Sequence, residues 1–309
     1  MARRKKPHKS GGKTSVVSLV VIAMVAIVAV IKTGRADDII GSMGDATASA
    51  LAETVTRPLA DVAGASRAMS GGGSAAVSGV TASELERVAM PHNTRSEIVQ
   101  HTGYVVSHNS KWKIPNWVAY ELTRREVAGT NPRNDEFCPD PDVRGHKAQL
   151  EDYRGSGYDR GHMAPAADMK WSKKVMRESF YLSNMCPQNP SLNRGDWNDL
   201  EEKVRKWAKR DSAIIVVCGP IIPKRPKTIG HGKVAVPTAF FKVVLSPYGG
   251  KTSAIGFIMP NEKCNAPLKT YARTIDEVEA ATGFDFFAAL PDDVEQSVEA
   301  GYSLDYWNL

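Results

Sequence analysis

From His92 onward, apolar residues fall into short runs whose length suits β-strands. Each run is rich in Val, Ile and aromatic residues. Such runs, bounded by turn-forming residues, are typical of strands. One run ends at Gly219-Pro220 and another at Pro260, where proline interrupts strand pairing. The predicted strands cover residues 102–107, 117–122, 213–218, 240–245 and 254–259.

Two segments show the spacing and end signals of helices. Between residues 196 and 210, large apolar residues recur three and four positions apart, which places them on one helix face, with Asp196 as the N-cap. A second helix begins at the capping box Thr-Ile-Asp-Glu of residues 274–277 and ends at Gly283. Together with the strands, these helices predict an α+β fold.

A longer apolar run lies near the N-terminus. No charged residue occurs between Thr14 and Ile31, and residues 16–31 are almost entirely aliphatic. A helix needs roughly 17 to 25 apolar residues to cross the hydrocarbon core of a bilayer. We therefore predict one transmembrane helix at residues 15–33, which is either a signal-anchor or a cleaved signal peptide.

The charges around this run favour the anchor. Residues 1–14 contain six Lys or Arg, and Lys32 and Arg35 stand where a signal peptidase requires small residues. Residues 1–14 are then a basic cytoplasmic tail, and the rest of the chain lies outside the cytoplasm, on the periplasmic or cell-surface side. Cleavage of the segment would instead make the protein secreted.

The stretch after the apolar run has the composition of a linker. Residues 38–83 are dominated by Ala, Gly, Ser, Thr and Val, and they include Gly71-Gly72-Gly73-Ser74. So few large apolar residues cannot bury a core, and such chains act as flexible tethers. We therefore predict a low-complexity linker at residues 34–90 and one folded domain at residues 91–309.

Positive charge is concentrated in the N-terminal segment. The formal net charge is +6, and residues 1–35 carry eight Lys or Arg and no acid, which leaves 6 − 8 = −2 for residues 36–309. The folded domain is therefore not a strongly basic nucleic-acid binder as a whole. Any polyanion must be bound by local arginines.

The cysteines do not indicate a metal site. Cys138, Cys186, Cys218 and Cys264 form no C-x-x-C pair and have no histidine at ligand spacing, so neither zinc binding nor redox catalysis is predicted. An extracytoplasmic domain permits disulfides, and three complete pairings are open. Cys138 with Cys186 is the pairing considered first, and Cys218, within an apolar strand, is expected to be a free core thiol.

Candidate chemistry is concentrated in residues 159–169 and 183–201. The first segment begins Asp-Arg-Gly-His and places Arg160 two residues before His162. An imidazole can take a proton from water near neutral pH, and a guanidinium matches two phosphate oxygens. The second segment supplies amide and carboxylate oxygens, which a hard divalent cation prefers. These groups suit hydrolysis of a phosphodiester.

Each of these residues also has an ordinary structural interpretation. Arg144-Gly145-His146 repeats the tripeptide of residues 160–162, but only the second copy follows Asp and precedes Met-Ala-Pro, so His146 is assigned no site role. Arg160 can be an ion-pair partner of Asp159, which we interpret as structural. Asn193 can be a turn residue, and Glu201 can pair with Arg205 on one helix face.

Several ordered motifs resemble the DNA/RNA non-specific endonuclease family, the ββα-metal nucleases that include mitochondrial endonuclease G. The resemblance covers residues 104–298. It is carried by Asn-Trp-Val-Ala-Tyr at 116–120, Asp-Arg-Gly-His at 159–162, Leu-Asn-Arg-Gly-Asp-Trp at 192–197 with Leu-Glu at 200–201, and Leu-Pro-Asp-Asp-Val at 290–294. It implies the ββα-metal (His-Me finger) nuclease fold, with a central antiparallel sheet flanked by helices.

The resemblance also implies roles for individual residues. His162 would be the general base, and Asn193 would be the direct protein ligand of a Mg²⁺ ion, for which Mn²⁺ could substitute. Glu201 would hold the same ion through a water molecule, and Arg160 would clamp the scissile phosphate. Arg133 best matches a second arginine expected upstream, with Arg124 and Arg125 as competitors. Asn184 would be a supporting residue of the site.

The implied function is hydrolysis of DNA and RNA phosphodiester bonds with little sequence preference, leaving 5′-phosphate ends. The substrates would be contacted mainly through phosphates. Two alternatives stay open: a catalytically inactive surface receptor for nucleic acid, and a substrate-specific phosphodiesterase or toxin nuclease. The sequence leaves open whether the protein is a homodimer and whether an inhibitor protein exists.

Overall fold

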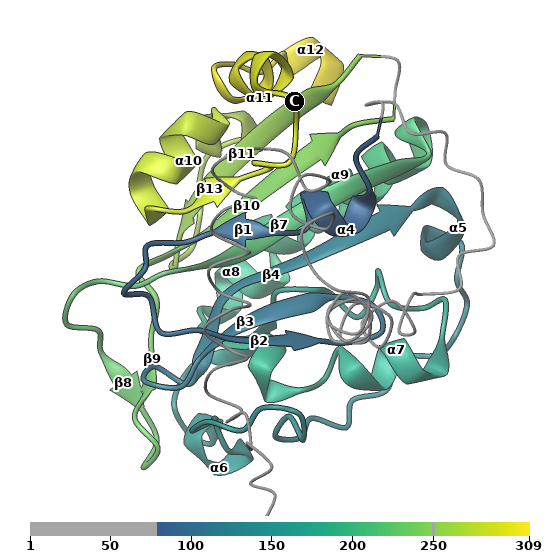
Figure 1. Cartoon of the computed structure of the whole chain (residues 1–309). Coiled ribbons are helices and arrows are strands. Elements are labelled where there is room, and N and C mark those ends of the chain that lie inside the picture. Colours follow the sequence, from purple (N-terminus) through teal and green to yellow (C-terminus); the bar gives the residue numbers. More distant parts are fainter. Residues whose placement is uncertain (1–78, 249–250) are drawn as a thin grey trace, which may run out of the picture. The chain divides into compact units, whose positions relative to one another are not determined.

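The computed structural model describes residues 79–248 and 251–309, which are built around one large sheet (Figure 1). This seven-stranded sheet has the order β12-β11-β10-β7-β4-β3-β2, and all its neighbouring strands are antiparallel. Its strands are β2 (Glu97–Gln100), β3 (Val105–Asn109), β4 (Ile114–Thr123), β7 (Ala213–Ile221), β10 (Ala239–Ser246), β11 (Ser253–Pro260) and β12 (Ala272–Arg273).

Three two-stranded sheets accompany the large one. They pair β1 (Val88–Ala89) with β13 (Asp285–Phe286), β5 (Asp159–His162) with β6 (Met185–Gln188), and β8 (Thr228–Ile229) with β9 (Val234–Ala235). The helices are α4 (Ala82–Leu85), α5 (Arg124–Val127), α6 (Leu150–Tyr153), α7 (Lys173–Glu178), α8 (Pro190–Arg194), α9 (Asp196–Asp211), α10 (Ile275–Thr282), α11 (Asp292–Glu299) and α12 (Leu304–Trp307), with 3₁₀ turns η1 (Leu182–Asn184) and η2 (Leu268–Tyr271).

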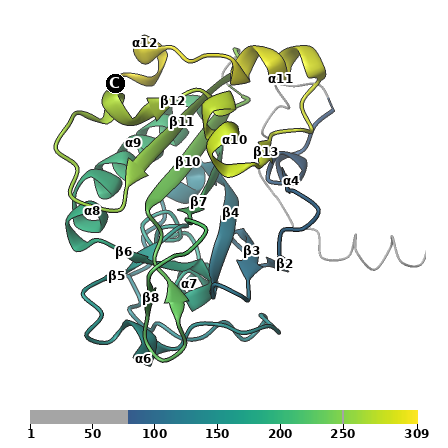
Figure 2. The ribbon, with the colours of Figure 1, turned by 90° about the vertical axis from the view of Figure 1, so that its left-hand side faces the viewer.

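Both faces of the large sheet are covered. Figure 2 shows α8 and α9 on one side of the sheet and α10 and α11 on the other. Alternate residues of β4 enter different cores: Val118 and Tyr120 pack with α9, whereas Trp117 and Ala119 pack with α10 and α11. Two-sided burial explains why the central strands are mostly apolar runs and do not alternate between apolar and polar residues. The predicted α+β class, with a central antiparallel sheet flanked by helices, is confirmed.

Both predicted helices are present, with one correction. Helix α10 is capped by Thr274, whose side chain accepts from the Glu277 amide at 3.1 Å, and it ends at Gly283 with φ +73°. Helix α9 begins at Asp196, but its N-cap is Gly195, so the prediction that Asp196 is the N-cap is wrong. Asp196 instead lies in the first turn, where its carboxylate interacts favourably with the positive end of the helix dipole.

Four of the predicted strands overlap β4, β7, β10 and β11. The remaining one, predicted at residues 102–107, is shifted relative to β3. Strand β3 begins at Val105, not at residue 102, because Thr102 turns toward α7 and its amide donates to Glu178 Oε2 at 2.9 Å. The glycine that follows fits closely against the same helix, since a Cβ on Gly103 would lie 2.3 Å from Val175 Cγ1.

Packed structure extends N-terminal to the predicted domain start at residue 91. Leu85 and Val88 are buried in the core beside α10, and Glu86 Oε1 accepts from the Glu121 amide at 2.8 Å. The predicted tail (1–14), the anchor (15–33) and most of the linker lie outside the described residues. Among the described residues, no helix is long and apolar enough to span a membrane.

The four cysteines are free thiols, which contradicts the considered Cys138–Cys186 disulfide. The two cysteines pair with different segments: Cys138 forms an isolated β-bridge with Tyr181, whereas Cys186 in β6 lies opposite Gly161 in β5. Cys218 is fully buried in β7 and donates to the Met163 carbonyl at 3.1 Å, as expected of a core thiol.

Candidate active site

The short β5–β6 pair presents the Asp-Arg-Gly-His motif. In its register, Asp159 faces Gln188 and His162 faces Met185. Glycine is required between Arg160 and His162, because a Cβ at Gly161 would lie 2.1 Å from Gln188 Oε1 and 2.6 Å from Gln188 Cβ. The close approach of β6 therefore sets the directions in which the two flanking side chains leave β5.

His162 lies against an aromatic wall. Its ring is edge-on to Phe180, with centroids 5.0 Å apart, and tilted against Phe137 at 5.7 Å. Nε2 is buried and has no hydrogen-bond partner among the described residues. Burial of the ring, followed by repulsion from Arg133, lowers the pKa of His162 to about 3. The imidazole is therefore neutral near pH 7, as a general base must be.

Two arginines lie on the same aromatic wall. The Arg160 guanidinium is 3.9 Å from the Phe137 ring centroid, and that of Arg133 is 5.0 Å from the centroid of Phe180. Arg133 also pairs with Asp135 at 2.7 Å. Its competitor Arg124 instead donates to the carbonyls of Lys209 and Arg210 at the C-terminal end of α9. The structure thus places Arg133 and Arg160 beside His162.

Asn193, on α8, is held by Asp159. Its Nδ2 donates to Asp159 Oδ2 at 2.9 Å, and Arg194 binds both oxygens of the same carboxylate at 2.7 and 2.8 Å. Burial would raise the pKa of Asp159, but these hydrogen bonds outweigh it and lower the pKa below its usual value. Asp159 therefore orients the Asn193 side chain through its amide nitrogen and not through its amide oxygen Oδ1.

Glu201 lies in a buried group of charges contributed by α9, strand β10 and the segment between β5 and α7. Burial raises its pKa to about 7, the neighbouring Asp168 adds to the rise, and Lys242 and Arg205 oppose it. Arg205 pairs with Asp168 at 3.0 Å, and Lys242, fully buried, lies 4.6 Å from the centroid of the Trp197 ring. The expected alternative partner of Glu201, Arg205, is thus bound to a different carboxylate.

The Asn184 side chain forms hydrogen bonds with the backbone of neighbouring segments. Its side chain accepts from the Ala164 amide at 2.8 Å and donates to the carbonyls of Ala164 and Ser179 at 2.9 Å each. It is fully buried, and its own carbonyl accepts from the Met163 amide. These bonds fix the chain directly after His162.

One pocket of about 460 Å³ opens at this group. Arg160, Asn193 and Asp159 line it together with Arg133, Phe137, Leu150, Tyr153, Arg154, Tyr158 and Arg194. His162 and Glu201 do not line it: the first lies beside Phe137, and the second is buried within the protein. Guanidinium groups and aromatic rings together suit an anionic substrate that carries flat rings.

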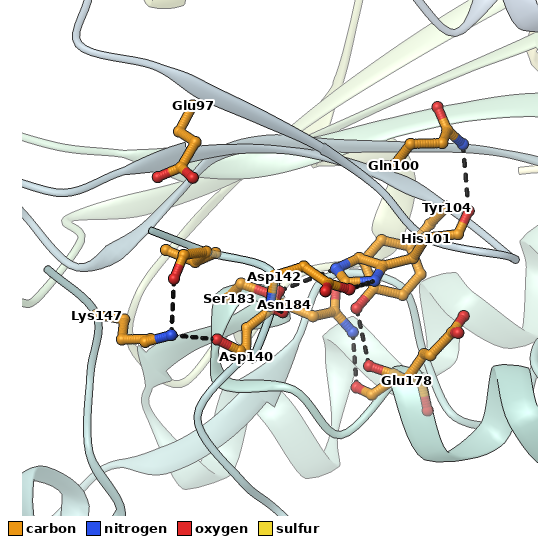
Figure 3. Close-up of polar contacts among 12 residues, drawn as sticks. Glu97, Gln100, His101, Tyr104, Asp140, Asp142, Lys147, Glu178, Ser183 and Asn184 are labelled. Atoms are coloured by element: carbon orange, nitrogen blue, oxygen red, sulfur yellow. Dashed lines mark hydrogen bonds and ion pairs between the residues drawn. The ribbon is translucent and has the colours of Figure 1, made fainter. Parts of the chain in front are cut away.

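A buried polar network, which the sequence did not reveal, supports the loop that carries Arg133 and Phe137 (Figure 3). Asp140 Oδ2 accepts from Ser183 Oγ and lies 2.9 Å from His101 Nε2, while Lys147 Nζ donates to the Asp140 carbonyl (Figure 3). His101 also lies 3.9 Å from Asp142. The network ties the turn between β2 and β3, this loop and η1 together.

His101, Asp140 and Asp142 are also close enough to be considered a metal-binding group. However, the two carboxylates approach opposite nitrogens of the imidazole, and Asp140 already accepts from Ser183 and from the Asp142 amide. No sequence signal marked this group, because His101 lies 39 residues before Asp140 in the chain. We interpret it as a brace for the site.

Replacement of Asp140 by Asn should destabilise the protein. Burial would raise the pKa of Asp140, but hydrogen bonds from His101 and Ser183 outweigh it and lower the pKa. This stabilisation is complete above the unfolded pKa and is lost as pH falls through the lower folded pKa. We expect Asp140→Asn to lower the free energy of unfolding by roughly 2 to 3 kcal/mol at pH 7 and by less at pH 3, measured by urea unfolding.

Asp142 provides the matched control. Its side chain is 64% exposed, compared with 0% for Asp140, and an exposed ion pair contributes little. Asp142→Asn should therefore change the free energy of unfolding by less than about 0.5 kcal/mol. Equal losses in the two variants would show that the network does not stabilise the loop.

Comparison with known proteins identifies the family. The family model of the DNA/RNA non-specific endonucleases matches residues 81–293. "Nuclease 1, mitochondrial" of Schizosaccharomyces pombe is 35% identical over 231 residues, which cover 68% of this chain and 71% of that protein. "Endonuclease G, mitochondrial" of Homo sapiens is 34% identical over 218 residues, 66% of this chain and 73% of that protein.

A solved structure agrees with the sequence comparison. The crystal structure of a complex of EndoG with EndoGI, described as showing the mechanism of EndoG inhibition, matches with a TM-score of 0.60 and 33% identity. The match covers 63% of this chain and 87% of that chain. The chain therefore belongs to the DNA/RNA non-specific endonuclease family. It is a nuclease, a hydrolase of phosphodiester bonds.

Proposed function

We propose that this nuclease is a Mg²⁺-dependent endonuclease that cleaves both DNA and RNA with little sequence preference and leaves 5′-phosphate ends. The observation that carries the proposal is the grouping of a neutral His162 with Arg133 and Arg160 on one aromatic wall. A base beside two permanent positive charges is the arrangement that water attack on a phosphodiester requires.

In this proposal each residue has one task. His162 takes a proton from the attacking water at Nδ1, because Nε2 is enclosed in the protein. Arg160 and Arg133 hold the scissile phosphate and offset the negative charge that grows on it. The rings of Phe137 and Phe180 keep water away from the buried side of the imidazole, which keeps it neutral.

The donor set fits a magnesium ion. The Asn193 amide oxygen is left over after its nitrogen binds Asp159, and Mg²⁺ prefers oxygen ligands and keeps most of its waters. Glu201, whose pKa is raised to about 7 by burial, is a carboxylate that a nearby divalent cation would stabilise in its charged form. Mg²⁺, or Mn²⁺ in its place, supplies Lewis-acid stabilisation of the leaving oxygen when bound.

We also propose that the nuclease is anchored by residues 15–33, with its catalytic part outside the cytoplasm. The support is the apolar run itself and the basic residues that precede it. This arrangement would keep a non-specific nuclease away from the cell's own nucleic acids.

The test uses the full-length chain with plasmid DNA and with a structured RNA, in Mg²⁺, in Mn²⁺ and in EDTA. We expect both substrates to be degraded with either metal and neither in EDTA. Fragments should be ligated without prior phosphorylation, because their 5′ ends carry phosphate. Binding without cleavage under every divalent ion would favour the receptor alternative, and cutting at one site or of one nucleic acid would favour the specific enzyme.

A further inference from the structure

A cationic segment outside the pocket follows strand β7. Between Ser212 and Asn261 the sequence contains no Asp or Glu, and its positive residues are concentrated in residues 222–233, which we call the basic hairpin. They are Lys224, Arg225, Lys227 and Lys233. Because residues 36–309 sum to −2, this concentration is a local feature and not a property of the domain.

The charges of the basic hairpin face solvent. All four positive residues are exposed. None of the ion pairs found among residues 79–248 and 251–309 involves Lys224, Arg225 or Lys227. An ordinary solvated surface intersperses both signs of charge, whereas an acid-free group of cations creates a positive potential that attracts polyanions.

The basic hairpin is also firmly attached. Strands β8 and β9 pair antiparallel, Val234 and Ala235 are buried, and the Ala235 amide donates to the Trp112 carbonyl at 3.1 Å. Gly230 and Gly232 pack closely on Asp152 of α6, because a Cβ on either would lie within 2.5 Å of that residue. The Gly232 amide donates to Asp152 Oδ1 at 2.6 Å.

This attachment joins the basic hairpin to the active-site pocket. Asp152 is followed directly by Tyr153 and Arg154, which line the pocket. Figures 1 and 2 both show β8 projecting from the sheet on the side where α6 lies. A pocket of about 460 Å³ holds only a small part of a polynucleotide. A duplex carries a negative charge about every 1.7 Å of its axis, so its phosphates must continue past the pocket.

We propose that the basic hairpin is a second phosphate-contacting surface, which binds the backbone of a double-stranded substrate beyond the nucleotides held in the pocket. The inference rests on the proposed function. Lys224, Arg225 and Lys227 contact phosphates without reading bases, so they add affinity and salt dependence but no sequence preference.

The test compares the full-length variant K224Q/R225Q/K227Q with a control of equal charge loss, K206Q/K209Q/K251Q. The control lysines are exposed and lie on the last turns of α9 and between β10 and β11, at the opposite end of β7 from the hairpin. Binding of a 30-base-pair DNA duplex is measured in EDTA across a series of salt concentrations. Cleavage of the same duplex and of a tetranucleotide is then measured in Mg²⁺.

We expect the hairpin variant to bind the duplex roughly 10- to 50-fold more weakly at low salt, and its slope of log Kd against log salt to fall by about 2 to 3. Its KM for the duplex should rise with kcat unchanged, and its tetranucleotide cleavage should match wild type. The control should stay within about twofold.

Two results would overturn the inference: equal salt slopes for variant and control, or equal losses on the duplex and the tetranucleotide. The second result would mean that the substitutions distort the pocket through Asp152. A wild-type protein that neither binds nor cuts nucleic acid would instead refute the proposed function itself.

Discussion

Replacement of His162 by Ala should lower kcat on plasmid DNA by about 10²- to 10⁴-fold, because it removes the imidazole that we assign as the general base, and no histidine lines the pocket to replace it. Since Arg133 and Arg160 remain, binding of the phosphodiester should be retained, and KM should change much less than kcat. Initial rates of supercoil loss under saturating Mg²⁺ measure both parameters.

The chain contains its own control for this experiment. His146 stands in a second Arg-Gly-His tripeptide, but the contact found for it is that of its backbone carbonyl, which accepts from His108 Nε2 at 2.9 Å. His146→Ala should therefore retain nearly full activity. Comparable losses in the two variants would indicate general damage to the fold, and an active His162→Ala protein would remove His162 from the role of base.

Much of the fold was predictable because burial leaves a periodic trace in the sequence. Strands β4, β7 and β10 are covered on both faces, so they are largely apolar, and the buried stripe of α9 recurs at helical spacing. The shift at β3 shows the limit of this signal. Thr102 has the character of a strand residue, but its bonds to Glu178, far away in sequence, draw it into a turn.

The sequence predicted the residues of the candidate site but not the side chains that hold them in place. Strand β5 consists of Asp159 to His162, which has no apolar pattern and becomes a strand only by pairing with β6. Buried polar residues such as Asp140 and Lys242 carry no local signal, since their partners come from distant segments. Arg133 could be preferred over its neighbours only from the family resemblance, and its aromatic contact now supplies a physical reason.

These supports explain how the candidate site keeps its geometry. The carboxylate of Asp159 orients Asn193, the amide of Asn184 fixes the backbone after His162, and Asp140 holds the loop that carries Phe137. Each support is a polar side chain that binds the backbone or another side chain of a different segment. Catalysis by positioned dipoles and charges depends on such rigidity, because a displacement of about 1 Å can cost on the order of 10²-fold in rate.

Asn193→Ala should weaken binding of the metal ion more than binding of the substrate. The substitution removes the amide oxygen that we assign to the cation, so we expect kcat to fall by about 10²- to 10³-fold and the Mg²⁺ concentration for half-maximal activity to rise by roughly 10- to 100-fold. Activity is measured across a Mg²⁺ titration at saturating DNA, and Mg²⁺ binding is measured separately by calorimetry.

Asp159→Asn tests whether the orientation of this ligand matters. The variant keeps Asn193 but weakens the charged acceptor that binds Asn193 and Arg194, so the Mg²⁺ requirement should rise by roughly 10-fold or more with the ligand still present. Ser191→Ala, an exposed change on the same short helix, should leave the titration unchanged. If Asn193→Ala keeps the wild-type Mg²⁺ titration, the cation is held elsewhere, and Asp159 then orients Asn193 for a structural purpose alone.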